Sequence, residues 1–170
     1  PLVCMGYINN VLTYGVEKFV LAAKSAGLDG AIIPDLPYEE ASNMLAICKK
    51  NDFSLINFVT PNTTAQRINE TCKNADGFIY CVSVNGVTGV REIDYTPINE
   101  VVKIVKQQTQ TPVAIGFGIG TPAAAKAASS VADNIIVGSA VMQKLMAEGL
   151  TAYGELIKTI RQALDEGSQV

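Results

Sequence analysis

The sequence predicts an α/β protein of the (β/α)8-barrel class, in which six βα units can be identified. Six short apolar runs begin 22 to 34 residues apart, and segments with a helical pattern lie between them. Several runs end in polar or glycine-rich loops, and no G-x-G-x-x-G sequence follows the first run, which favours a barrel over a doubly wound sheet. An open six-stranded domain is the alternative.

The apolar runs are expected to be strands. Each is shorter than a typical helix and is bounded by turn residues, as expected of parallel strands that are buried on both faces. In chain order the predicted strands occupy residues 2–7, 30–36, 54–60, 78–84, 112–118 and 134–140.

Five segments between or after these runs are predicted helices. The first ends on a glycine, the second begins with a proline and two glutamates, and the third follows Thr63 or Thr64 as N-cap. The fourth begins with Thr121 and Pro122, and the last is amphipathic. These helical segments occupy residues 15–30, 37–51, 63–77, 121–132 and 151–167.

We expect a single domain over residues 1–170. A (β/α)8 barrel has eight strands and typically about 250 residues. With six units visible, the chain is interpreted as a partial barrel containing strands three to eight of a parent fold, with roughly the first two units absent.

Composition argues against several function classes. Apolar residues make up 48% of the chain and the net charge is −3, with basic residues scattered, so no nucleic-acid partner is expected. No apolar run is long enough for a membrane span, and the chain opens without a signal-peptide pattern. The four cysteines form no C-x-x-C pair and are interpreted as reduced thiols of a cytoplasmic protein. The absence of histidine argues against a Ser-His pair and against a zinc site.

The last two predicted strands end in sequences that suit a phosphate site. They read "GFGIGTP" and "VGSAVMQKLM", and barrels of this class often bind phosphate at these two loops. Gly116 and Gly118 would let backbone N–H groups face an anion, while Gly138 and Ser139 open a short helix. The alternative is that these glycines only form tight turns.

Other candidate residues follow the remaining strands. The loop "SVNGVTGVRE", residues 83–92, has the length to cover a ligand, although it could be an ordinary surface loop. Asp35 is the most prominent acid at a strand end, but acid–base chemistry on a carbon–carbon bond usually needs two groups. We therefore interpret Asp35 as a loop or interface residue. The polar residues at strand ends are Tyr7, Asn9, Asp35, Asn57, Thr60 and Tyr80.

Taken together, "PLVCMGYINN", "GAIIPDLPYEE", "FIYCVSVNGVTGVRE", "PVAIGFGIGTP" and "IIVGSA" resemble the α subunit family of tryptophan synthase over the whole chain. The resemblance implies a (β/α)8 lyase that splits indole-3-glycerol phosphate by a retro-aldol step into indole and glyceraldehyde 3-phosphate. It also implies an α2β2 complex, in which indole passes to a β subunit that carries pyridoxal phosphate. This chain itself would then hold no cofactor and no metal.

The resemblance also assigns roles by position. Tyr80 and Thr88 match groups near the family's catalytic aspartate. The phosphate-site positions are Gly89, Gly116, Phe117, Gly118, Gly138 and Ser139. The indole-pocket positions are Met5, Tyr7, Ile32, Pro34 and Phe58. The positions on loops that meet the β subunit are Asn9, Asp35, Pro37, Asn85 and Gly86.

One departure from the family pattern affects the chemistry. The family's catalytic glutamate and aspartate lie on its first two strands, which have no counterpart in this sequence. We therefore expect the isolated chain to be inactive. Two alternatives remain: another barrel that binds sugar phosphates, or an inert partial barrel that binds only phosphate and a partner subunit.

Overall fold

The computed structural model describes residues 1–82 and 94–167, and its centre is one parallel sheet of six strands in sequential order. Each strand lies within one of the predicted apolar runs. The strands are β1 (Val3–Met5), β2 (Gly30–Ile32), β3 (Ser54–Val59), β4 (Ile79–Val82), β5 (Val113–Gly116) and β6 (Asn134–Ile136).

The helices confirm the five predicted segments and add two that the sequence reading missed, α1 and α5. Pro97 lies in the first turn of α5, and four buried side chains follow at helical spacing: Ile98, Val101, Val102 and Val105. The helices are α1 (Ile8–Tyr14), α2 (Val16–Ser25), the 3₁₀ turn η1 (Tyr38–Glu40), α3 (Ser42–Lys50), α4 (Ala65–Lys73), α5 (Thr96–Gln108), α6 (Pro122–Ser129) and α7 (Ser139–Gly167). Non-helical torsions at Gly149 divide α7 into a short first segment and the predicted final helix.

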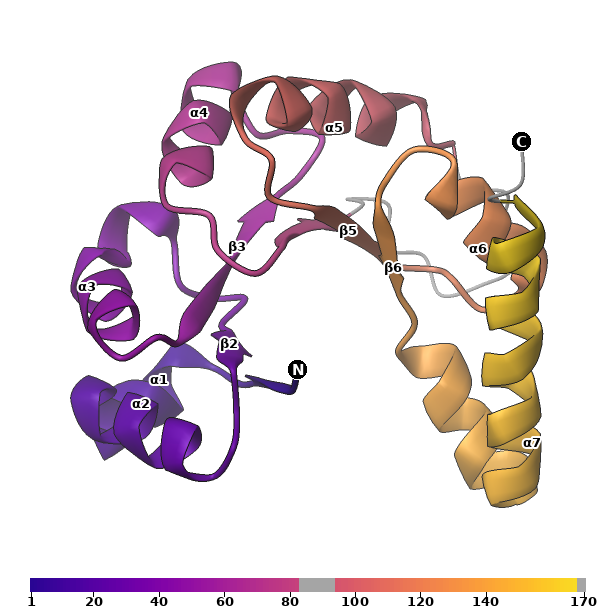
Figure 1. Ribbon diagram of the computed structural model, residues 1–170, viewed down its shortest axis with the longest axis horizontal. Helices are drawn as coiled ribbons and strands as arrows, with labels where there is room; N and C mark the ends of the chain where they lie inside the picture. Colours follow the sequence, from indigo (N-terminus) through magenta and orange to yellow (C-terminus); the bar gives the residue numbers. More distant parts are fainter. Residues whose placement is uncertain (83–93, 168–170) are drawn as a thin grey trace.

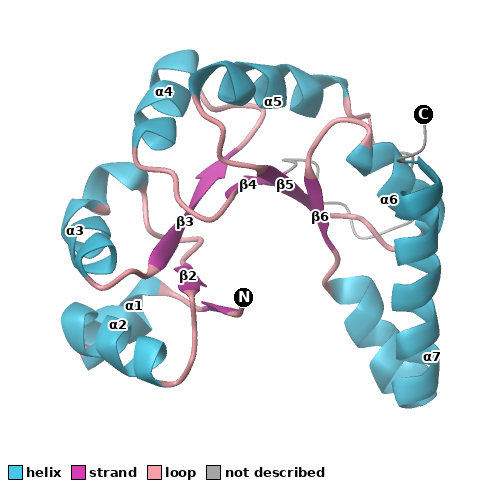
Figure 2. Ribbon diagram, viewed as in Figure 1, coloured by secondary structure: helices cyan, strands magenta, loops and turns pink. Residues whose placement is uncertain are grey.

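The sheet curves into an arc with the helices on its outer side, as Figures 1 and 2 show. Each strand pairs in parallel with the next strand of the sequence, from β1 to β6. A doubly wound sheet would reverse its strand order and carry helices on both faces. The doubly wound alternative is therefore wrong. The architecture is a half-barrel, as expected of the (β/α)8 class.

Side chains that point outward from the sheet form two separate apolar clusters. The first packs β1, β2 and the start of β3 against α1, α2 and α3, with Ala31, Ile33 and Leu55 from the sheet side. The second begins at Val59 and joins the later strands to α4, α5, α6 and α7. Because side chains alternate across a strand, the residues between these positions face the concave side of the arc.

Aspartates at the amino ends of three strands link those strands to their neighbours. Asp29, just before β2, accepts a 2.6 Å hydrogen bond from the backbone N–H of Leu2. Asp133, just before β6, accepts a 2.9 Å bond from the N–H of Val113, and Asp76 before β4 accepts one from the Ser54 hydroxyl. These bonds fix the amino-terminal edge of the sheet, and the candidate site lies at the opposite edge.

Two smaller findings concern the predicted environment. Within residues 1–82 and 94–167, no helix is long and apolar enough to cross a membrane. All four cysteines are unpaired, in line with the interpretation as thiols.

Candidate functional site

The concave face of the sheet carries most of the predicted pocket residues. Met5 lies opposite Ile32 in the β1–β2 register, and Phe58 lies opposite Tyr80 in the β3–β4 register. The outward clusters are built from the alternate residues of the same strands, so these four side chains share the inner face. The structure therefore brings together, on one face, residues that are up to 75 positions apart in the sequence.

Aromatic rings form the centre of this face. The Phe58 and Tyr80 rings stack with centroids 5.3 Å apart, and Phe78 lies 6.5 Å from Tyr80. Burial raises the pKa of the Tyr80 phenol above its ordinary value, so the hydroxyl is neutral near pH 7. A neutral phenol can donate one hydrogen bond and also accept, in a wall that is otherwise apolar.

Gly116 makes room for Tyr80. A Cβ on Gly116 would lie 2.1 Å from the Tyr80 hydroxyl oxygen and 2.5 Å from the ring carbon that bears it. No side chain other than glycine's fits there unless Tyr80 moves. The sequence reading assigned this glycine to the approach of an anion, whereas the structure shows that the Tyr80 side chain occupies the space beside it.

The two loops of the predicted phosphate site adjoin each other. Gly116 pairs with Ile136, and a Cβ on Gly120 would lie 3.2 Å from the Cβ of Ala140 in the first turn of α7. Gly118 has a φ of 68°, in the left-handed region that favours glycine. Gly138 and Ser139 are exposed where α7 begins, and no atom lies within 4 Å of a Cβ at Gly138.

Phe117, between Gly116 and Gly118, is half exposed at 50%, so its ring is available beside these loops. Together with Gly118, Gly138 and Ser139, it forms an exposed rim at the carboxyl ends of β5 and β6. No ligand distance tests the phosphate assignment, which stays a prediction. Asn85, Gly86, Thr88 and Gly89 lie outside the described residues.

The predicted interface residues lie at the carboxyl ends of β1 and β2. Asn9 and Pro37 are exposed there, and so are Tyr7 and Pro34, which the resemblance assigned to the indole pocket. Asp35 is also exposed, and its Oδ1 accepts a 2.9 Å hydrogen bond from the backbone N–H of Ile8 at the start of α1. This bond ties two neighbouring loops together and agrees with the interpretation of Asp35 as a loop residue.

Asn57 does not belong to the concave face. Its side chain is buried on the outer side, where Nδ2 donates a 3.2 Å hydrogen bond to the backbone oxygen of Thr71 in α4. The alternation along β3 gives this result, because Phe58 faces inward and Asn57 must face the helices. The alternation of side chains along β3 is the sequence signal that separates Asn57 from the other polar residues at strand ends.

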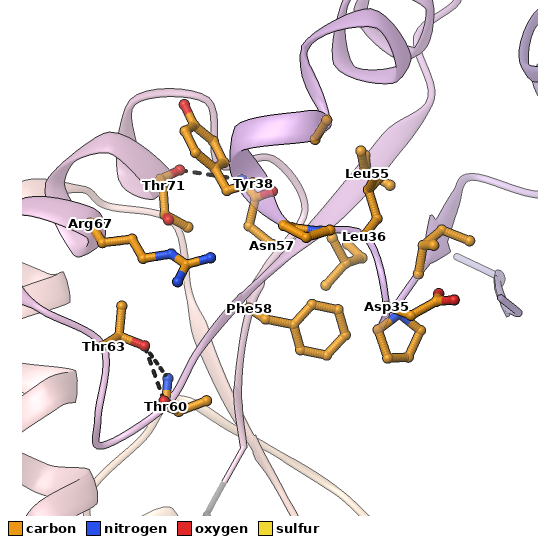
Figure 3. A pocket seen from close by; sticks show the side chains of 15 residues that line it. Asp35, Leu36, Tyr38, Leu55, Asn57, Phe58, Thr60, Thr63, Arg67 and Thr71 are labelled. Carbon is orange, nitrogen blue, oxygen red and sulfur yellow. Dashed lines mark hydrogen bonds between the residues drawn. The ribbon is translucent and has the colours of Figure 1, made fainter. Parts of the chain in front are cut away.

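A cavity of about 320 Å³ lies beside Asn57, between the carboxyl ends of β2 and β3 (Figure 3). Its lining includes Pro34, Asp35, Pro37 and Phe58, which the sequence pointed to, and Arg67, which it did not. Arg67 is on the outer helix α4, so strand-end patterns could not have found it.

Acid–base and metal-binding groups are scarce in this part of the molecule. Among the residues of the six described strands, none is Asp or Glu. In residues 1–82 and 94–167, no three His, Cys, Asp or Glu side chains gather where they could hold a metal ion. The concave face can thus bind an aromatic group, but its strands supply no carboxylate for proton transfer.

Sequence comparison identifies the family of this chain. Residues 1–166 match the family described as tryptophan synthase alpha chain. A tryptophan synthase alpha chain from Thermoanaerobacter sp. (strain X514) is 47% identical over 145 residues, which are 85% of this chain and 55% of the relative. One from Acinetobacter baumannii is 42% identical over 170 residues, covering 98% of this chain and 64% of the relative. The chain thus spans between about half and two thirds of the length of these relatives.

Solved structures agree with this result. A tryptophan synthase alpha chain from Legionella pneumophila superposes with a TM-score of 0.87 at 32% identity, covering 100% of this chain and 64% of that chain. A tryptophan synthase structure from M. tuberculosis gives 0.85 at 33% identity, covering 95% of this chain and 61% of that chain. The similarity therefore extends over nearly all of this chain, in fold as well as in sequence.

Proposed function

This chain belongs to the tryptophan synthase alpha chain family, and we propose that its protein cleaves indole-3-glycerol phosphate into indole and glyceraldehyde 3-phosphate. In this retro-aldol step, C3 of the indole ring takes up a proton and its bond to the glycerol chain breaks. The hydroxyl on the released carbon gives up its proton and becomes the aldehyde. The observation that carries the proposal is the stacked Phe58–Tyr80 wall on the same edge of the sheet as the glycine-rich loops.

The proposal gives the two ends of the substrate different surroundings. Met5, Ile32 and Phe58 hold the indole ring on the apolar inner face, and Tyr80 contributes a neutral hydroxyl beside it. The phosphate binds at the exposed rim of Gly118, Gly138 and Ser139, where backbone N–H groups begin α7.

Proton transfer requires groups that the described strands lack. Protonating C3 and deprotonating the hydroxyl call for an acid and a base, and no Asp or Glu lies on β1 to β6. We therefore propose that the 170-residue chain by itself binds substrate without turning it over. An inert partial barrel, the second candidate, would share this lack of turnover but would not prefer the indole ring.

Partner and location follow from the family in the same way. We propose an α2β2 assembly in the cytoplasm, in which a β subunit carrying pyridoxal phosphate receives the indole. The exposed loop residues Asn9, Asp35 and Pro37 would face that subunit. This chain would need neither cofactor nor metal of its own.

The test compares two ligands on the purified 170-residue chain. Calorimetry should show that indole-3-glycerol phosphate binds at least tenfold more tightly than glycerol 3-phosphate, while an indole assay detects no product. Phe58→Ala should remove this preference and leave glycerol 3-phosphate binding unchanged. Equal affinity for the two ligands would overturn the indole assignment, and indole release would overturn the proposed inactivity of this chain.

A further inference from the structure

The cavity between β2 and β3 is created by a divergence of the two strands. Their pairing ends at Ile32 and Ile56, while β3 continues and pairs with β4 through Asn57, Phe58 and Val59. After Ile33 the chain turns away through Pro34 towards η1. The strands leave between them a cavity of about 320 Å³, the lower end of the volume range of small-molecule sites.

One end of this cavity holds a guanidinium group. In Figure 3 the Arg67 guanidinium extends from α4 into the cavity, towards the space between Tyr38 and Thr63. One of its N–H groups donates to Glu39 Oε2 at 2.9 Å, which orients the guanidinium. A guanidinium has five donors in a planar fork, so it can bind a second anion alongside Glu39.

Hydroxyl groups lie near Arg67 and form, with it, the polar end of the cavity. The Thr63 hydroxyl oxygen lies 3.1 Å from that of Thr60 and accepts a 2.8 Å bond from the Thr60 backbone N–H. The Tyr38 hydroxyl accepts a 2.8 Å bond from Asn74 Nδ2. These contacts fix the side chains around Arg67, so the polar end is held in place before any ligand arrives.

The other end of the cavity is apolar. Leu36 and Leu55 line it together with Phe58, whose ring is fixed by stacking on Tyr80. The nearby carboxylate of Asp35 is engaged by the N–H of Ile8, at the start of α1. An apolar group can therefore lie at this end while a charged group reaches Arg67.

We propose that this cavity binds a small molecule with an aromatic or branched apolar group at one end and a carboxylate at the other. The carboxylate pairs with Arg67, and the apolar group lies against Leu36 and Phe58. The cavity shares Pro34 and Phe58 with the residues assigned to the indole ring, but none of the residues assigned to the phosphate end of the substrate lines it. The carboxylate position at Arg67 is therefore separate from the proposed phosphate site.

The test uses 3-phenylpropionate as a probe on the 170-residue chain, with its neutral amide as the matched ligand. Protein NMR should show saturable shifts at residues 33–38 and 55–71, and the amide should bind at least tenfold more weakly. Arg67→Met should weaken binding of the acid at least tenfold. Arg161→Met, which breaks an exposed Arg161–Asp165 pair instead, should leave it unchanged.

A second variant keeps the proposal testable if Arg67→Met fails to fold. Leu36→Trp fills the apolar end, so it should abolish probe binding while Arg67 stays in place. Equal binding of acid and amide would overturn the proposal, as would binding that survives Leu36→Trp. Shifts confined to Met5, Ile32 and Tyr80 would place the probe in the proposed indole site, and shifts confined to Gly118, Gly138 and Ser139 would place it in the proposed phosphate site. Either result would also overturn the proposal. Because the readout is neither indole-3-glycerol phosphate binding nor indole release, its failure is distinct from failure of the proposed function.

Discussion

The closest steric constraint in the candidate site joins Gly116 to Tyr80. The φ of Gly116 lies outside the left-handed region, so among the described residues the crowding by Tyr80 is what requires glycine at this position. We predict that Gly116→Ala lowers the free energy of unfolding by about 1–3 kcal/mol, because the half-buried phenol must shift. Urea denaturation measures this change.

Gly138→Ala is the matched control, since a Cβ there meets nothing within 4 Å. Its effect should stay within about 0.5 kcal/mol. If both variants lose the same amount of stability, the Tyr80 contact does not explain why residue 116 is glycine.

Asp133 offers a prediction about pH. Burial by itself would raise its pKa, but hydrogen bonds from Lys106 and from the Val113 N–H, with the Lys106 charge, lower the pKa overall. A lowered folded-state pKa stabilises the fold above the ordinary value of about 4, and the effect disappears as pH falls through the folded-state pKa. Because the side chain is partly exposed, we expect Asp133→Asn to cost only about 1 kcal/mol at pH 7.

The measurement is urea denaturation of both proteins between about pH 7 and pH 3. The difference between them should shrink towards the acid end. Asp165→Asn, which affects an exposed pair within α7, is the control and should have a smaller effect at pH 7, because solvent screens that pair. If the stability difference between Asp133→Asn and the unmodified protein stays constant with pH, the folded-state pKa of Asp133 is not lowered as argued.

At the scale of elements, α1 depends on a side chain from another βα unit. Its own N-cap residue, Tyr7, makes no side-chain capping bond, and its first turn contains no acidic residue. Asp35 supplies both a hydrogen-bond acceptor and a negative charge at Ile8. We predict that Asp35→Ala destabilises the chain by about 1 kcal/mol and speeds amide exchange in residues 8–11.

Hydrogen exchange followed by mass spectrometry resolves this effect from a global one. The amides of α2 should keep their protection, and Glu40→Ala, an exposed change in η1, should alter neither helix. Uniformly faster exchange across both helices would show that Asp35 acts on overall stability and not on α1.

The positions of the strands were predictable because each is an apolar run with turn residues at both ends. The helix α1 escaped notice because it has seven residues and depends on Asp35 from another unit. By contrast, α5 has four buried residues at helical spacing and could have been found. Local patterns predict elements well when the cause of the element is local.

The candidate site was predictable to a smaller extent. Tyr80 was predicted from its position at a strand end and Phe58 from the family resemblance. Their place on one face follows from the alternation of side chains along a strand. The Gly116–Tyr80 contact, and the presence of Arg67 in the same cavity as Phe58, depend on how neighbouring units pack, which no local pattern specifies. The roles of the four predicted site residues within residues 83–93 remain predictions, because the structure does not describe this segment.

At the scale of the whole molecule, two apolar clusters that share no residue support the same sheet. Leu55 belongs to the first and Val59 to the second, with the polar Asn57 between them on β3. We predict that the clusters lose protection separately. Ile68→Ala, at a fully buried position of the second cluster, should cost about 2–5 kcal/mol there.

Amide exchange should then rise in α4, α5 and α6 but not in α2 and α3. Met44→Ala in the first cluster should give the reverse pattern. If either variant raises exchange equally throughout the described residues, the half-barrel opens as one cooperative unit.

Exposed apolar side chains lie on the elements at both ends of the arc. Leu2, Met5 and Leu12 are more than half exposed at the β1 end, and Met146 and Leu150 are 84% and 74% exposed on α7. The accessible surface is 10347 Å², against about 8,000 Å² expected of a compact monomer of 18.0 kDa. A stable protein–protein interface buries about 800 Å² on each partner. The accessible surface above that of a compact monomer is larger than this area.

We therefore predict that the 170-residue chain, purified alone, associates in a concentration-dependent way. Light scattering coupled to size-exclusion chromatography should give a mass above 18.0 kDa that rises with loading. Met146→Lys combined with Leu150→Lys should shift the distribution towards monomer without lowering thermal stability, because both side chains already lie in solvent. Ile157→Lys, at a less exposed position of 42% further along α7, is the control and should shift it less. A single mass of 18.0 kDa at all loadings would mean that these exposed apolar side chains do not drive association.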